Sequence, residues 1–410
     1  MSDYFYLSPL TFSNILSISM KYGLSEKMNN KIYMDNAGTS PMAPEVIKTM
    51  TDAMTNVFGN ASATNYYGRE AKRVLENSRH VIAQSINADD KEIIFTSGGT
   101  ESDNTAIIQT ALARQNEGKH IISTKFEHEA VLRPLARLEK MGFEVTYLDV
   151  DENGQINLDD LRNAIRPDTI LVTIMMVNNE VGSLAPIKEI GEIVAPTNAW
   201  FHTDAVQAYG EVPIDVKDMK IDLLSTSAHK LNGPKLIGFL YERDGIDLPP
   251  FMLGGDQELK RRPGTENVPA IAGFAKAVEI HSYKAILANE ERYFNFKHTL
   301  VDGLKKNGID IEVNGNIEDQ MAPQVISIWF KGIRNDVLLT NLDLAGVVGA
   351  AGSACTAGSL DPSHVLIAMY GKDSPRVWES LRFSFSIENT IEEVRSVVDT
   401  LTKIIKRLNK

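Results

Sequence analysis

The chain alternates short apolar runs with longer stretches in which apolar residues recur every three or four positions. Runs that are rich in β-branched and aromatic residues and end in a polar residue or glycine predict strands, and the periodic stretches between them predict helices. Seven strands are predicted in this way, at 92–96, 121–125, 145–150, 170–177, 200–203, 223–226 and 239–241. Such alternation is typical of βαβ units. We therefore expect an α/β fold around a mostly parallel seven-stranded sheet, with helices on both faces.

A different pattern follows this region. A helical stretch from about 270 to 297 leads out of the sheet, and beyond it come strand candidates at 325–330 and 380–386 and an amphipathic helix at 391–408. We predict a large domain at 31–288, whose first residues pack on the small domain, and a smaller α+β domain at 289–410. We expect residues 1–30 to be an N-terminal extension. Because Met28 precedes the strand-like segment at 31–35, a wrongly assigned start is an equal alternative.

Composition narrows the class of protein. With 43% hydrophobic and 23% charged residues, the chain has the make-up of a soluble globular protein. Its net charge of -12, from 42 Lys and Arg against 54 Asp and Glu, argues against direct binding of nucleic acid. No apolar stretch has membrane-spanning length, and residues 1–28 lack the basic region of a secretory signal. We expect a cytoplasmic protein.

The single cysteine, Cys355, lies among Gly, Ala, Ser and Thr residues at 349–359. One cysteine forms no internal disulfide and no Cys-x-x-Cys zinc pair, so a reducing compartment fits and no metal site is expected. A free cysteine is usually a small buried hydrophobe. Here, however, few large side chains surround the thiol that could bury it and raise its pKa. We therefore favour a nucleophile.

Candidate chemistry lies where strands end, because ligands of parallel sheets bind at the carboxyl ends of the strands. After the first predicted strand, Gly98 and Gly99 precede a helix, so that backbone N–H groups and the helix dipole favour an anion such as phosphate. A tight strand-to-helix turn also needs glycine, and that alternative stays open.

Three further polar residues follow strands. Asp204 suits either a helix N-cap or a carboxylate that binds a protonated ring nitrogen. Lys230 is either a solvated charge or, if partly withdrawn from water, a Schiff-base lysine. His128 is either a capping residue or an imidazole that lies against an aromatic cofactor. Together with a phosphate cradle, these residues indicate pyridoxal 5'-phosphate.

The sequence from about residue 30 to its end resembles the cysteine desulfurases, in the NifS/IscS-like branch of the class-V pyridoxal-phosphate aminotransferases. The motifs that carry the resemblance are Asp35-Asn36-Ala37, Thr96 to Asn104, Glu127-His128, Asn178-Asn179-Glu180, Asp204 to Gln207, Ser227 to Lys230, Arg262 to Asn267, Gly352 to Cys355 and Leu381 to Ser384. The resemblance implies a fold-type-I transferase that acts as a homodimer.

The resemblance also implies a role for each matching residue. Lys230 would hold the cofactor, Asp204 would bind its ring nitrogen, Gln207 its phenolic oxygen, and His128 would stack on the ring. The implied phosphate ligands are Gly99, Thr100, Ser227, His229 and, from a second subunit, Thr265. Asn179 and Arg382 would bind the substrate carboxylate, with Asn179 also beside the cofactor.

In the implied reaction, L-cysteine becomes L-alanine while Cys355 takes up the sulfur as a persulfide. The persulfide would be passed to a sulfur acceptor, such as an iron-sulfur scaffold or a tRNA thiolation enzyme. Two alternatives stay open: a selenocysteine lyase or aminotransferase of the same class, and a non-catalytic binding protein on the same fold.

Overall fold

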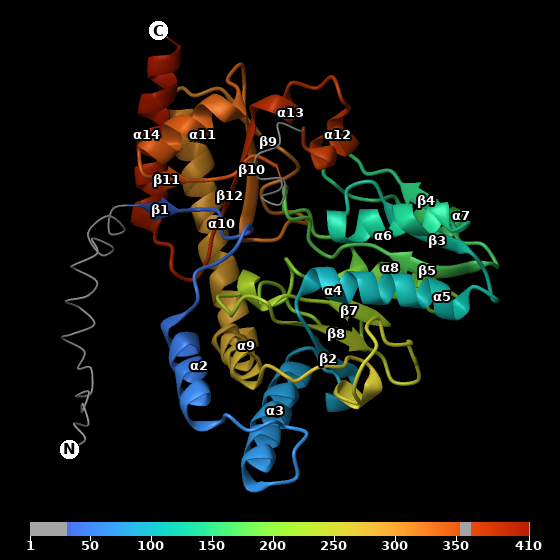
Figure 1. Cartoon of the computed structure of the whole chain (residues 1–410). Helices are drawn as coiled ribbons and strands as arrows, with labels where there is room; N and C mark the ends of the chain where they lie inside the picture. Colours follow the sequence, from blue (N-terminus) through green and yellow to red (C-terminus); the bar gives the residue numbers. More distant parts are fainter. Residues whose placement is uncertain (1–30, 353–361, 410) are drawn as a thin grey trace, which may run out of the picture.

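The computed structural model describes residues 31–352 and 362–409 (Figure 1). Its centre is a seven-stranded sheet in the order β2-β8-β7-β6-β5-β3-β4. The strands are β2 (Ile93–Thr96), β3 (His120–Thr124), β4 (Glu144–Leu148), β5 (Thr169–Thr173), β6 (Trp200–Asp204), β7 (Leu223–Ser225) and β8 (Gly238–Glu242). Only β8 runs against its neighbours. The expectation of a mostly parallel seven-stranded sheet is therefore confirmed.

One predicted strand, 170–177, is too long, because β5 ends at Thr173. The amides of Ile174 and Met176 still bind carbonyls of β6, but the Met175 amide donates to the Glu127 carboxylate. This side-chain bond replaces a bond of the regular ladder, so the chain leaves the sheet earlier than its apolar pattern indicates.

Helices cover the large sheet. They are α2 (Pro44–Asn56), α3 (Tyr66–Ser85), α4 (Gly99–Asn104), which continues through a π-helical turn, η2 (Thr105–Gln109), into α5 (Thr110–Arg114), and then α6 (Glu129–Lys140), α7 (Leu158–Ala164), α8 (Ile187–Val194) and α9 (Val268–Ile280). The inner strands are buried on both faces. Continuous apolar runs in place of strict alternation are what such burial requires.

The C-terminal part has its own sheet, in the order β12-β10-β9, and its own apolar core. Its strands are β9 (Ile311–Val313), β10 (Val325–Phe330) and β12 (Ser380–Ser384), and its helices are α10 (Tyr283–Lys306), α11 (Asn335–Leu344), α12 (His364–Tyr370), α13 (Arg376–Glu379) and α14 (Ile391–Leu408). Near the start of the chain, β1 (Ile32–Tyr33) pairs with β11 (Val347–Val348) of this part. The first described residues thus join the C-terminal part, although they precede the large sheet in sequence (Figure 1).

The continuous helix expected over 270–297 is wrong. The chain forms two helices, α9 and α10, that are separated at His281 and Ser282. His281 is buried, and its ring bonds to the Gly210 carbonyl and to the Asn232 side chain. These tertiary bonds hold the break, which the helical periodicity did not reveal. The domain boundary that we predicted at 288/289 falls inside α10 and stays a prediction.

We expect Glu211→Gln to flatten the pH dependence of stability. Burial raises the pKa of Glu211 to about 8, so the folded protein holds a proton that the unfolded chain releases. The free energy of unfolding therefore falls as pH rises from about 4.5 to about 8, and glutamine removes this contribution. Thermal unfolding at pH 6 and pH 8 measures it. The exposed Glu189→Gln should leave the pH dependence as it is, and equal slopes in wild type and Glu211→Gln would contradict the expectation.

Candidate active site

The carboxyl ends of β2, β3, β5, β6 and β7 lie along one edge of the large sheet, and a cavity opens there. It is lined by Ala37, Gly38, Gly99, Thr100, Asp103, His128, Met175, Asn179, Asp204, Val206, Gln207, Ser227, His229, Lys230 and Arg382. Most of the predicted site residues therefore meet in one cavity. The exceptions are Thr265, which is exposed on a loop outside this lining, and Cys355, which lies outside the described residues.

The turn between β2 and α4 brings backbone close to the cavity. Gly98 has φ +142°, a conformation that L side chains rarely adopt. A Cβ on Gly98 would lie 3.3 Å from Ser227 Oγ, so this hydroxyl stands beside the turn. A Cβ on Gly99 would lie only 2.5 Å from Val206 Cγ2. Both glycines are needed for the turn, and the N–H groups in the first turn of a helix, which have no partner within the helix, suit an anion.

Gly99→Ala should weaken binding of pyridoxal 5'-phosphate roughly 10-fold, because overpacking of this size typically costs about 1–3 kcal/mol and displaces the turn. Titration of the cofactor-free protein, followed by fluorescence quenching, measures the dissociation constant. Adding Val206→Ala removes the clashing methyl and should restore part of the affinity, relative to Val206→Ala alone. Unchanged affinity in Gly99→Ala would show that the turn does not contact the phosphate.

Asp204, the last residue of β6, is buried, and its Oδ1 accepts a hydrogen bond from the Val206 amide at 2.9 Å. Burial raises the pKa of Asp204, whereas the neighbouring His128 and Lys230 lower it. A buried carboxylate at this edge of the sheet is suited to stabilise a protonated ring nitrogen. The N-cap alternative is not seen, because no helix begins after this residue.

Lys230 ends a short 3-10 turn, η3 (Ala228–Lys230), that follows β7. Its Nζ donates to the carbonyls of Ala37 at 2.6 Å and Gly38 at 2.8 Å. Gln207 Nε2 donates to the same Ala37 carbonyl at 2.8 Å. The segment after β1 thus closes one side of the cavity and holds the lysine and the glutamine next to each other.

The two histidines of the cavity differ in their surroundings. His128 is the N-cap of α6, where its Nδ1 accepts from the Ala130 amide at 3.1 Å, so the capping alternative holds while the ring also lines the cavity. His229 Nδ1 bonds with Thr39 Oγ1 at 3.1 Å. Burial, with the charge of Lys230, lowers the pKa of His229 to about 4. His229 is therefore neutral at pH 7 and can donate or accept a hydrogen bond at a phosphate.

Arg382 comes from β12 of the C-terminal part and is buried against the cavity. Its Nη1 donates to the Asn179 carbonyl at 2.8 Å, and its Nη2 pairs with Asp35 Oδ1 at 2.6 Å. Its buried Nε has no hydrogen-bond partner among the described residues. The guanidinium is thus held by both parts of the chain, and it has further N–H groups beyond these two bonds for a carboxylate.

Two residues of the site had no role in the sequence-based prediction. Asp35 orients Arg382, and Asp103 lines the cavity as a buried carboxyl whose Oδ1 lies 3.6 Å from His202 Nε2. Burial, and then the charge of Asp204, raise the pKa of Asp103 well above its usual value. Asp103 comes three positions after Thr100 on one helix, so helical spacing could have placed both on the same side.

Within residues 31–352 and 362–409, no group of three or more His, Cys, Asp or Glu side chains could hold a metal ion. No helix in the described part of the chain is long and apolar enough to cross a membrane.

Comparison with known proteins agrees with this geometry. Residues 32–397 match the family model "Aminotransferase class-V". A protein of Bacillus subtilis (strain 168) that is named as a cysteine desulfurase, IscS 1, is 50% identical to this chain. The match covers 92% of this chain and 99% of the Bacillus protein. A solved NifS-like protein shares 32% identity over 92% of this chain and all of its own, with a TM-score of 0.86. A structure described as SspA in complex with cysteine shares 34% identity over 88% of this chain and all of its own, with a TM-score of 0.75.

The family model matches most of the chain. The Bacillus subtilis protein is half identical to it in sequence over nearly its whole length. The chain belongs to the class-V aminotransferase family and, within it, to the cysteine desulfurases.

Proposed function

We propose that the cavity around Lys230 is the site at which this cysteine desulfurase converts L-cysteine into L-alanine, and that Cys355 receives the sulfur. The protein uses pyridoxal 5'-phosphate, as its family does. When bound, this cofactor supplies an electron sink that weakens the carbon-sulfur bond of the substrate. The observation that carries the proposal is the convergence of Lys230, Asp204, His128 and the Gly98-Gly99 turn on one cavity.

The cavity has the parts that the cofactor requires. Thr100, Ser227 and His229 line the cavity, with Ser227 beside the glycine turn, and would bind the phosphate. Asp204 would hold the proton on the ring nitrogen, and Gln207 would turn from the Ala37 carbonyl to bind the phenolic oxygen. Asp204 is a buried carboxyl that lines this cavity, so a protonated ring nitrogen beside it would offset its charge, and the residues present fit the cofactor.

The substrate would be bound by its carboxylate. Arg382 is oriented by Asp35 and by the Asn179 carbonyl, and the guanidinium N–H groups that these two bonds do not use would bind a carboxylate oxygen. A guanidinium that is already fixed loses little entropy when it binds, which favours affinity. Lys230, once its amine is released, would move the α-proton.

Sulfur transfer then balances without an external oxidant. The Cys355 thiolate attacks the substrate sulfur and forms the new sulfur-sulfur bond, while the electron pair of the carbon-sulfur bond stays with carbon, which takes up a proton to become alanine. A sulfur-acceptor protein, such as an iron-sulfur scaffold or a tRNA thiolation enzyme, would remove the persulfide sulfur. We further propose a cytoplasmic homodimer in which Thr265 of one copy completes the phosphate site of the other.

Incubation of the purified protein with L-cysteine tests the proposal directly. We expect equal amounts of alanine and Cys355-bound sulfur in the first turnover, before any acceptor is added. Quantitative amino-acid analysis and mass spectrometry of the Cys355 peptide measure the two products. Alanine without bound sulfur would leave the site intact but remove Cys355 from the reaction.

A further inference from the structure

Three consecutive residues other than glycine adopt left-handed backbone conformations in the loop between β8 and α9. Their φ values are +48° at Glu258, +56° at Leu259 and +69° at Lys260. Each such residue costs on the order of 1–3 kcal/mol and persists only where its surroundings determine the conformation. Leu259 is 71% exposed and contributes little packing of its own. The cause therefore lies in contacts of the neighbouring residues.

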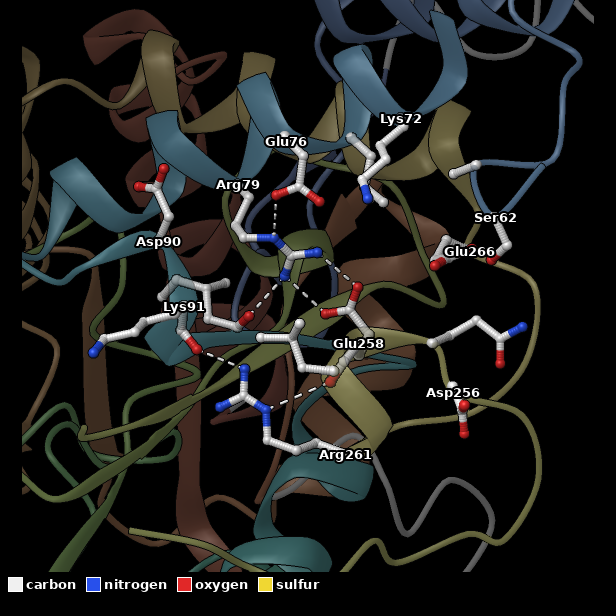
Figure 2. Close-up of a pocket in the computed structure, with 15 residues that line it drawn as sticks. Ser62, Lys72, Glu76, Arg79, Asp90, Lys91, Asp256, Glu258, Arg261 and Glu266 are labelled. Carbon is white, nitrogen blue, oxygen red and sulfur yellow. Dashed lines mark hydrogen bonds and ion pairs between the residues drawn. The ribbon is translucent and has the colours of Figure 1, made fainter. Parts of the chain in front are cut away.

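A buried ion pair holds this turn (Figure 2). Arg79, on α3, donates from Nη1 and Nη2 to the two carboxylate oxygens of Glu258, at 2.8 and 2.7 Å. Glu258 Oε2 also accepts from the Phe95 amide of β2 at 2.9 Å, and Arg79 Nη1 also donates to the Ile93 carbonyl at 2.7 Å. Both side chains are at least 90% buried. Removing Arg79 would leave the Glu258 carboxylate as an uncompensated buried charge, and removing Glu258 would leave Arg79 with only the half-exposed Glu76 as its carboxylate partner, so the pair fixes the position of the turn.

The residues that follow the turn are also fixed. Arg261 donates to the Lys91 carbonyl at 2.5 Å, as Figure 2 shows, and Arg262 pairs with Glu101 of α4 at 2.9 Å. The Gly264 amide donates to the Gln257 side chain at 3.0 Å. Thr265 comes next and is exposed, although the loop that carries it is tied to α3, β2 and α4. The protein therefore stabilises a strained loop whose tip does not reach the cavity of its own chain.

We propose that Glu258 is a positioning residue, which, through its ion pair with Arg79, holds Thr265 in the orientation needed to enter the phosphate site of a second copy of this chain. This inference rests on the proposed function and adds a positioning residue to its phosphate site. A flexible loop would lose conformational entropy on reaching into the partner, whereas a loop fixed in advance does not. The strained backbone at residues 258–260 is thus part of a loop that is held rigid, and this rigidity favours the contact between subunits.

A double-mutant cycle on the full-length protein tests this proposal, with the dissociation constant of pyridoxal 5'-phosphate as the readout. We expect Glu258→Gln and Thr265→Ala each to weaken binding roughly 10-fold, and the double variant to bind no more weakly than Thr265→Ala alone. Such non-additivity is the signature of one residue acting through the other. Independent, additive losses would overturn the proposal, because Glu258 would then act through β2 or through general stability.

The outcomes separate this proposal from the one on which it rests. If Thr265→Ala leaves cofactor affinity unchanged, the intersubunit phosphate contact is absent and the role of Glu258 falls with it, whereas the proposed reaction at Lys230 still stands. If Thr265→Ala weakens binding and Glu258→Gln does not, only the role of Glu258 falls. Should Glu258→Gln fail to fold, Arg79→Lys, which keeps the charge but loses the two-pronged geometry, takes its place in the cycle. Lys260→Gln changes an exposed side chain of the same turn without touching the ion pair, and should retain wild-type affinity.

Mixed dimers show whether Glu258 acts across the interface. A Glu258→Gln protomer paired with a Lys230→Ala protomer has one site that contains Lys230, and that site receives an intact loop from its partner. We expect this site to bind the cofactor with wild-type affinity, measured by the absorbance of the lysine-bound cofactor. Affinity as weak as in the Glu258→Gln homodimer would mean that Glu258 acts within its own subunit, which overturns the proposal.

Discussion

Lys230→Ala should abolish turnover of L-cysteine. The lysine Nζ lies in the cavity with Asp204, and it is the group that we assign to cofactor attachment and to movement of the α-proton. Loss of positioned proton transfer alone costs about 10²–10⁴-fold, and loss of covalent attachment adds to it. Alanine formation measures the rate, and the visible absorbance of the lysine-bound cofactor should disappear from the purified protein.

The control for Lys230→Ala is Lys48→Ala, which removes an exposed lysine of α2. Lys48 pairs with Asp52 at the surface, and such pairs contribute little to stability. This variant should keep both the absorbance and the rate. If Lys230→Ala retained its visible absorbance and its rate, the cofactor would be attached elsewhere, and our assignment of the cavity would be wrong.

Cys355→Ser should stop persulfide formation and lower L-cysteine desulfuration on the order of 10³-fold or more, since loss of a covalent nucleophile removes an entire reaction step. Serine is close to cysteine in size but forms no persulfide. Because Cys355 is the only cysteine, no other thiol of the chain can replace it. The rate of alanine formation and the protein-bound sulfur are the two measurements.

Cofactor binding separates the two variants. Cys355→Ser should keep the visible absorbance that Lys230→Ala loses, because the thiol is not assigned to cofactor binding. Sulfide release from L-cysteine at the wild-type rate by Cys355→Ser would instead favour an activity of the selenocysteine lyase kind, in which the protein thiol is not required.

The sequence predicted the large sheet well because its strands are buried on both faces. Continuous apolar runs such as those of β3 and β5 have few alternative explanations, and all seven predicted strands are present. The same pattern placed Asp204, Ser227 and Lys230 at carboxyl ends of strands, and the parallel order of β6 and β7 then brought them to one edge. For these residues, the local strand pattern was enough to predict their position at the edge of the sheet.

The sequence pattern failed where a long-range contact decided the local conformation. The bonds of buried His281 to Gly210 and Asn232 hold the break between α9 and α10. The left-handed turn at 258–260 contains no glycine and depends on Arg79, which is 179 positions from Glu258. Neither feature has a local signal, because the interactions that determine it come from residues far away in the chain.

By itself, the sequence determined the seven strands of the large sheet, the chemical kinds of side chain that follow each strand and the single thiol, since these depend on local periodicity and residue type. Only the tertiary structure decided that Asp35 orients Arg382, 347 positions away, and that the Ala37 carbonyl receives both Lys230 and Gln207. Contacts of this kind form when separate elements pack, and the identity of the partner is set by the three-dimensional position of each backbone, which no short stretch of sequence contains.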